Sequence, residues 1–260
     1  MLDPAQITAF IQDGFLRIPS ALSPELARQC RKIIWPETGC DPADPATWTE
    51  PLVRVSEHTT TEPFRRAVRM PLLEQAFDQL VGPGRWVRGS GLGSIPIRFP
   101  HADPPADDYW HFEGSYLPAG WSGHSWTNYR SRGRALLMLF LLSDVTEVDA
   151  PTRIRVGSHL FVPRLLLRYG EAGIDATRIE ETGVLAATAD LPLAYATGSA
   201  GDVYLCHPFL IHAAQAHRGT MPRFLAQPAL APAVPLEVDR ADGAYSPIER
   251  AIRIGLGRPS

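Results

Sequence analysis

The sequence predicts a mainly β fold with flanking α-helices, because two kinds of pattern occupy different parts of the chain. Up to about residue 84, apolar residues recur mostly at helical spacing, whereas short apolar or alternating runs follow from residue 85, separated by Gly, Pro and Asp. Closely spaced runs bounded by turn residues are typical of an all-β sandwich or barrel. A chain of 260 residues fits a single domain of this kind, with a mostly helical part over 1–84 and a β core over 85–260.

Three helices are predicted in the first part. One covers Leu2 to Asp13, where an Asp-Pro pair suits a cap followed by a first helical turn. A second is opened by Ser-Pro-Glu and runs from Pro24 to about Ile34. A third covers Glu62 to Val81, with an apolar stripe along it and Gly-Pro-Gly after it. Phe15 to Pro19 is predicted as a short strand, and Trp35 to Trp48 as a loop rich in Pro, Asp and Thr.

In the second part, six short runs are predicted as strands. They are Trp86 to Arg88, Ser94 to Phe99, Ala135 to Leu142, Thr152 to Val156, Val203 to Cys206 and Phe224 to Ala231. Val162 to Tyr169 is predicted as a helical turn inserted between strands.

Composition narrows the classes of function. The net charge is −3 and the pI is near 6.2, so nothing favours a nucleic-acid partner or an anionic membrane. No apolar run is long enough to span a bilayer, and the N-terminus lacks a signal-peptide pattern. The three cysteines (Cys30, Cys40, Cys206) contain no CxxC pair, which disfavours a disulfide framework. We therefore expect a cytoplasmic protein that acts on a small molecule; its oligomeric state stays open.

A candidate metal site begins in the segment WHFEGSY, residues 110–116. His111 and Glu113 are spaced i, i+2, which on a strand places both side chains on the same face. With His212, about a hundred residues later, they would form two histidines and one carboxylate. Such a set suits iron(II) and leaves coordination positions open, where a 2-oxo acid could chelate and dioxygen could bind.

His-x-Glu alone is a weak signal, and in isolation it more often has a structural role. The segment around His212 makes a metal site the better interpretation. Arg223 follows His212 by eleven residues, at the start of an apolar run. A strand arginine can bind a carboxylate with two hydrogen bonds, although alone it is more often part of a surface ion pair.

The chain resembles the phytanoyl-CoA dioxygenase family of iron(II)/2-oxoglutarate oxygenases. Four segments carry the resemblance: AQITAFIQDGFLRIPSALSPE near the N-terminus, WHFEGSY, LLSDVTEVDAPTRIRVGSH at 141–159, and the segment that holds His212 and Arg223. The resemblance implies a double-stranded β-helix, a cupin-like jelly roll of two antiparallel sheets.

The same resemblance implies a set of site residues. Fe(2+) would be bound by His111, Glu113 and His212, and the far carboxylate of the cosubstrate 2-oxoglutarate by Arg223, with dioxygen as the other cosubstrate. Arg98 and Thr152 or Arg153 are further candidates for contact with 2-oxoglutarate. His159, in Gly-Ser-His, is expected to be structural.

Two positions depart from the family pattern. Glu113 stands where the family usually has aspartate; the ligand type is kept, and a carboxylate here argues against halogenation. Ala214 stands where some relatives place a serine that helps the arginine hold the cosubstrate. Arg223 would therefore need a different helper, which the sequence does not identify.

The activity implied is a dioxygenase that oxidises a small molecule and releases succinate and CO2, by hydroxylation or by cyclisation or epimerisation, in a setting such as secondary metabolism. No acid–base catalytic set is expected. The aromatic residues Trp110, Tyr116 and Trp126 are candidates for substrate contact, although core packing explains most such side chains. Leu117 to Arg134 is the best candidate for a substrate lid.

Two other classes of function stay open at this stage. One is a cupin-type metal enzyme that does not use 2-oxoglutarate, which would have no need of Arg223. The other is a non-catalytic binding module in which Glu113 marks a decayed site. Retention of both histidines and of Arg223 argues against decay.

Overall fold

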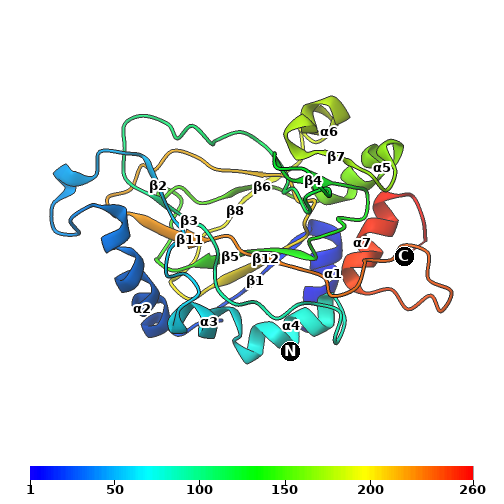
Figure 1. Ribbon diagram of the computed structural model, residues 1–260, viewed down its shortest axis with the longest axis horizontal. Coiled ribbons are helices and arrows are strands. Elements are labelled where there is room, and N and C mark those ends of the chain that lie inside the picture. Colours follow the sequence, from blue (N-terminus) through cyan, green and yellow to red (C-terminus); the bar gives the residue numbers. More distant parts are fainter. Residues whose placement is uncertain (260) are drawn as a thin grey trace.

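An antiparallel sheet of seven strands forms the main layer of the computed structural model, which describes residues 1–259 (Figure 1). Its order is β1 (Phe15–Ile18), β9 (Val203–Cys206), β5 (Leu136–Leu141), β11 (Arg223–Ala226), β3 (Ile95–Arg98) and β2 (Leu52–Val55), with β12 (Ala229–Leu230) also paired to β5. A smaller sheet holds β10 (His212–Ala213), β6 (Arg153–Arg155) and β8 (Leu193–Tyr195), and a ribbon joins β4 (Trp126–Thr127) to β7 (Ile174–Asp175). The predicted mainly β jelly roll is confirmed.

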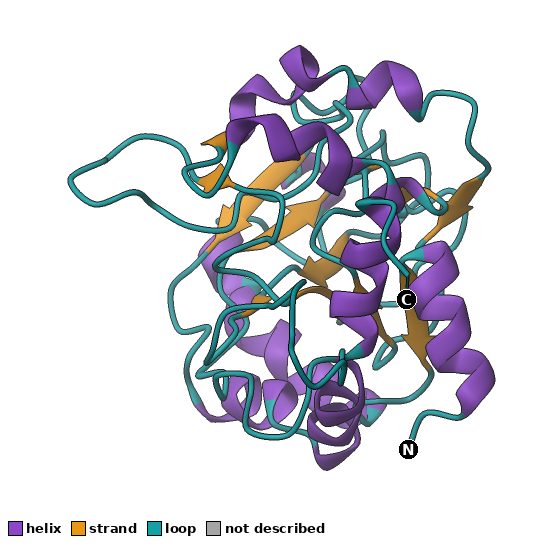
Figure 2. Cartoon of the chain, turned by 90° about the vertical axis from the view of Figure 1, so that its right-hand side faces the viewer, coloured by secondary structure: helices purple, strands orange, loops and turns teal. Residues whose placement is uncertain are grey.

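Helices enclose the strands, as Figure 2 shows. α2 (Pro24–Ile34), α3 (Glu62–Val68) and α4 (Pro71–Leu80) lie along one side of the main sheet in Figure 1, and α1 (Pro4–Asp13) packs on α7 (Pro247–Gly255). α5 (Val162–Leu166) and α6 (Val184–Ala187) lie at the same end of the molecule as α7. The short 3-10 helices are Pro36–Thr38, Pro45–Thr47, Ser158–Leu160, Leu167–Tyr169 and Ala176–Thr182. No helix within residues 1–259 is long and apolar enough to cross a bilayer.

The central strand β5 explains the most apolar run of the sequence. Leu136, Met138 and Phe140 belong to the larger hydrophobic core, whereas Leu137, Leu139 and Leu141 belong to a second core on the other face. Successive side chains of a strand point to opposite faces, so a strand buried on both sides needs a continuous apolar sequence. The sheet is thus covered on both faces, by helices on one side and by the smaller sheet on the other.

Two predicted elements are each divided by a proline. The helix predicted over 62–81 is two helices, because Met70 adopts an extended conformation (φ −60°, ψ 130°) before Pro71. The residue before a proline is sterically disfavoured in the α region. The strand predicted over 224–231 is likewise β11 and β12, with Pro228, which has no N–H to donate, between them.

Other differences concern short or irregular segments. Trp86 to Arg88 forms only an isolated bridge, between Trp86 and Pro232. The edge strand β2 is not predicted from the sequence, and with β1 it places residues from the first 84 in the main sheet. The metal motif does not lie in a regular strand either, since its His111 forms a single bridge with His212.

Candidate metal centre

Backbone pairing brings the two histidines together. The His111 N–H donates to the His212 carbonyl at 3.0 Å, and the His212 N–H donates to the His111 carbonyl at 2.9 Å. Their imidazole rings consequently lie side by side, with centroids 4.4 Å apart. Ligand atoms of His111, Glu113 and His212 all lie within 4.8 Å of one another. The structure therefore gathers the three residues that the sequence analysis selected.

Each imidazole is oriented by a backbone carbonyl. Nδ1 of His111 lies 3.1 Å from the Tyr109 oxygen, and Nδ1 of His212 lies 2.9 Å from the Leu210 oxygen. Donation from Nδ1–H fixes the tautomer that leaves Nε2 with a free lone pair, the arrangement that metal-binding histidines usually have. Nε2 of His212 is buried and has no hydrogen-bond partner among residues 1–259, and it lies 3.6 Å from Oε1 of Glu113. A divalent cation would satisfy both groups.

The charge states also suit metal binding. Burial, together with repulsion from His212, lowers the pKa of His111 to about 4, so its imidazole is neutral near pH 7. Burial raises the pKa of Glu113, but the neighbouring His212 imidazole and the positive charge of Arg134 outweigh this effect and lower the pKa to about 2. The site therefore offers a neutral imidazole and an ionised carboxylate, which are the ligand forms.

A polar cavity of about 130 Å³ adjoins the three residues, and two buried arginines line it. Arg223 of β11 and Arg98 of β3 are directly opposite each other in the sheet, and only 1% and 4% of their surfaces are exposed. Arg223 donates to the Ala150 carbonyl, but its Nε has no partner within residues 1–259, nor have Nε and Nη1 of Arg98. These free N–H groups in a buried cavity are suited to a carboxylate.

Arg98 lies beside Arg223 and carries further N–H donors, whereas the Ala214 side chain has none. Nη2 of Arg98 lies 2.8 and 2.9 Å from the two oxygens of Asp107, which also pairs with Arg54 at 2.8 Å. Burial lowers the pKa of Arg98, while the neighbouring Asp107 opposes that effect. The segment that carries Asp107 thus contributes a carboxylate to the wall of this cavity.

Of the two remaining candidates for this cavity, the structure brings one to it. Thr152 is buried and lines the cavity. The Arg153 guanidinium instead donates to the Ala214 and Asp108 carbonyls and lies 4.9 Å from the Trp110 ring centre. His159 is fully buried, and its Nε2 lies 3.0 Å from the Ile11 carbonyl, which agrees with the structural role expected for it.

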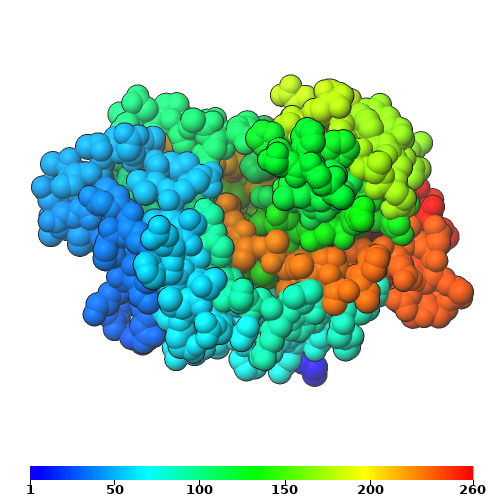
Figure 3. All heavy atoms as spheres, viewed as in Figure 1, coloured from blue at the N-terminus to red at the C-terminus, as the bar shows by residue number. Residues whose placement is uncertain are grey.

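A larger cavity of about 720 Å³ adjoins two of the three residues, His111 and Glu113. It is lined by Trp110 and Phe112, by His124 and Ser125 from the predicted lid, and by residues of the segment 176–185. Residues 117–134 form part of the bright green bulge on the face shown in Figure 3. Tyr109 lines both this cavity and the polar one.

Tyr116 and Trp126 do not line this cavity, although the sequence analysis selected them for substrate contact. The Tyr116 hydroxyl donates to the Ala172 carbonyl, and the Trp126 ring packs edge-on against Trp121. Their backbones pair with each other. Tyr109, which lines both cavities, was not predicted, although its place two residues before His111 was a usable signal.

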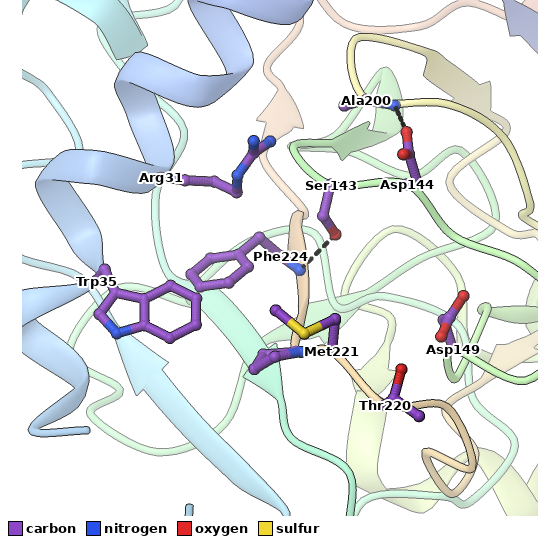
Figure 4. A pocket seen from close by; sticks show the side chains of 10 residues that line it. Arg31, Trp35, Ser143, Asp144, Asp149, Ala200, Thr220, Met221 and Phe224 are labelled. Atoms are coloured by element: carbon purple, nitrogen blue, oxygen red, sulfur yellow. Dashed lines mark hydrogen bonds between the residues drawn. The ribbon is translucent and has the colours of Figure 1, made fainter. Parts of the chain in front are cut away.

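A further cavity of about 450 Å³ lies beside Phe224, the neighbour of Arg223 on β11 (Figure 4). Two of its lining residues are aromatic, Phe224 and Trp35, and their ring centroids are 4.9 Å apart. Because side chains alternate along a strand, Phe224 points to the face opposite Arg223. This cavity is consequently separate from the candidate metal centre.

Comparison with known families identifies the chain. Residues 10–225 match the family described as phytanoyl-CoA dioxygenase (PhyH), and this range includes the three candidate ligands and Arg223. The chain belongs to the phytanoyl-CoA dioxygenase family. It is therefore an oxidoreductase of the non-haem iron and 2-oxoglutarate class, as the sequence predicted. A search of curated protein sequences finds no match.

Solved structures of this class have the same fold. The 2-oxoglutarate-dependent carbocyclase SnoK from nogalamycin biosynthesis is 18% identical, with 89% of this chain and 84% of that chain covered and a TM-score of 0.61. The epimerase SnoN, in complex with Fe3+, α-ketoglutarate and nogalamycin RO, is 17% identical, with 94% of each chain covered and a TM-score of 0.61. HygX from Streptomyces hygroscopicus, with nickel and 2-oxoglutarate bound, is 19% identical, with 95% and 96% covered and a TM-score of 0.57.

Proposed function

We propose that this phytanoyl-CoA dioxygenase family member binds Fe(2+) through His111, Glu113 and His212 and oxidises a small molecule held in the larger cavity. The observation that carries this proposal is the buried Nε2 of His212, which lacks a partner within residues 1–259 and faces a carboxylate oxygen at 3.6 Å. Two histidines and one carboxylate with open positions are the ligand set of non-haem iron(II) oxygenases.

The two arginines would bind the cosubstrate. The distal carboxylate of 2-oxoglutarate would accept hydrogen bonds from the free N–H groups of Arg223 and Arg98, with Thr152 beside them. Its 2-oxo acid end would then point toward the histidines that line the same cavity. A cupin without 2-oxoglutarate would have no use for two buried guanidinium groups here.

Iron(II) and 2-oxoglutarate would supply the oxidising chemistry, in which dioxygen is consumed and succinate and CO2 are released. The chain's own residues would hold the reactants in place and exclude water. Tyr109 lines both cavities and would contact both cosubstrate and substrate. Trp110, Phe112 and Ile179 would supply apolar contacts to the substrate, with His124 and Thr177 as polar ones.

The substrate class proposed is a ring-bearing natural-product intermediate. SnoK is named as a carbocyclase and SnoN as an epimerase, and one HygX structure holds hygromycin B. A cavity of about 720 Å³ that is lined by aromatic and polar residues is large enough for a compound of that kind. The outcome would be hydroxylation, or another oxidation such as cyclisation or epimerisation.

The test is release of succinate from 2-oxoglutarate with Fe(II) and dioxygen, first alone and then with a panel of glycosylated and polycyclic compounds. A true substrate is expected to stimulate succinate release and to be oxidised in equal amount. A His111→Ala variant should lose both reactions. Succinate release that His111→Ala leaves unchanged would overturn the ligand assignment.

A further inference from the structure

Arg134 lies beside the carboxylate that stands where the family usually has aspartate. Its Nη2 is 3.4 Å from Oε2 of Glu113, and its Nε donates to the Gly114 carbonyl at 3.2 Å. Within residues 1–259, Glu113 is the only carboxylate within 4.0 Å of this guanidinium. Oε1, the other oxygen of Glu113, faces Nε2 of His212. The two oxygens therefore have different partners.

Hydrogen bonds stabilise the turn that carries Arg134, and the turn lies close against the metal motif. The Asn128 side chain accepts hydrogen bonds from the N–H groups of Arg130 and Arg132, and the buried Ser131 hydroxyl donates to the Arg134 carbonyl at 2.8 Å. A Cβ on Gly133 would lie 2.0 Å from the Ser115 carbonyl oxygen, so this turn can approach residue 115 only with glycine there. These contacts place the Arg134 guanidinium beside the Glu113 carboxylate.

We propose that Arg134 is a positioning residue that binds Oε2 of Glu113 and so directs Oε1 alone to the metal. The proposal rests on the assignment of Glu113 as a ligand. A guanidinium is a permanent cation without a lone pair to offer, so it orients a carboxylate without competing for the metal. Glutamate is longer than aspartate by one bond of about 1.5 Å. Arg134 fixes this longer side chain and keeps its second oxygen away from the open coordination positions.

The contact with Arg134 depends on the length of the Glu113 side chain. An aspartate at 113 would withdraw the carboxylate from Arg134 by about one bond length, and their 3.4 Å contact would be lost. The arginine should therefore matter for metal binding only when residue 113 is glutamate. This dependence separates a role in positioning from a general role of Arg134 in folding or in the electrostatic potential of the site.

The experiment is a double-mutant cycle on metal affinity, measured with Mn(II) by equilibrium dialysis and with Co(II) by visible absorption, without turnover. Arg134→Met should weaken binding about 10- to 100-fold, the range typical when a partner of a metal ligand is removed. In the Glu113→Asp background the same substitution should change affinity less than about twofold. Arg132→Met, which removes an equal charge two residues away, should have no effect in either background.

Three results would overturn the proposal. Unchanged affinity in Arg134→Met would show that Glu113 needs no partner, and tighter binding would show that the guanidinium mainly repels the cation. Equal loss in both backgrounds would assign Arg134 a structural role. Arg134→Gln, which keeps a donor for the Gly114 carbonyl, replaces Arg134→Met if that variant does not fold, with the same expectations. The Glu113→Ala variant distinguishes failure of the ligand assignment from failure of the proposal for Arg134. If Glu113→Ala binds metal normally, Glu113 is not a ligand, and the proposal for Arg134 fails with that assignment.

Discussion

Arg223 is a buried cation with no carboxylate within 4.0 Å among residues 1–259. Burial, together with repulsion from Arg98, lowers its pKa well below the usual value for arginine, so the charged form is destabilised in the protein without cosubstrate. Replacing it by methionine keeps most of the apolar stem and removes the charge. We expect this change to act in opposite directions on folding and on cosubstrate binding.

For cosubstrate binding, hydrogen bonds to charged groups are worth about 1.5–3 kcal/mol. Arg223→Met should therefore weaken binding of 2-oxoglutarate by about 10- to 150-fold. For folding, removal of the buried charge should stabilise the protein by several kcal/mol. Loss of the donor to the Ala150 carbonyl should destabilise it by only about 1–3 kcal/mol. The metal-free variant should consequently unfold at a higher temperature than the native protein, by about 2–4 °C for each kcal/mol of net gain.

Two assays on the same preparations test this prediction. Calorimetric titration of 2-oxoglutarate into the Mn(II)-loaded protein gives the binding constant, and thermal unfolding of the metal-free protein gives the stability. Arg28→Met, which removes an exposed arginine on α2, is the control for a change in net charge. A variant that is less stable but binds 2-oxoglutarate normally would refute the reasoning, since Arg223 would then be structural.

Three further predictions concern neighbouring features. Asp107→Asn should strengthen 2-oxoglutarate binding, measured by calorimetry, by up to about fivefold. The native Asp107 carboxylate pairs with Arg98 and would repel the 2-oxoglutarate dianion, so weaker binding in the variant would contradict this prediction. Burial lowers the pKa of His159 to about 4, so between about pH 6.5 and 4 the unfolded chain binds a proton that the folded protein does not. The free energy of unfolding should therefore fall by about 3 kcal/mol, from this residue alone, as the pH drops from 6.5 toward 4. Urea unfolding at pH 7.5 and 4.5 measures this loss, and His159→Gln should make the loss smaller. Gly133→Ala should lower both the unfolding temperature and Mn(II) affinity, because its Cβ would meet the Ser115 carbonyl at 2.0 Å; native values for both would show that the turn can move freely.

The parts of the site that could be predicted are those encoded by local sequence. His111 and Glu113 are adjacent in a short motif, and His212 and Arg223 lie in one segment that resembles the family. The match of residues 10–225 to that family supports the use of this resemblance. The helix starts were also predictable, since α1 and α2 begin with a capping Asp3 or Ser23 followed by proline.

The remaining parts depend on pairings between distant segments. That Arg98 lies opposite Arg223 follows from the register of β3 and β11, which no local pattern gives. The contact of Arg134 with Glu113 depends on the close approach of a turn 21 residues away in the chain. The helix break at Met70 could have been predicted from the sequence, because Pro71 disfavours a helical conformation of the residue before it. The apolar residues at helical spacing on both sides of Pro71 favoured one continuous helix instead.

The most direct test of the central claim is an anaerobic titration of the Fe(II)-loaded protein with 2-oxoglutarate, followed by visible absorption. We predict a weak charge-transfer band that saturates with one equivalent of 2-oxoglutarate, is absent in Glu113→Ala and requires far more 2-oxoglutarate in Arg223→Met. Iron that binds in the native protein without any such band would contradict the account, because the metal would then not be chelated by the 2-oxo acid.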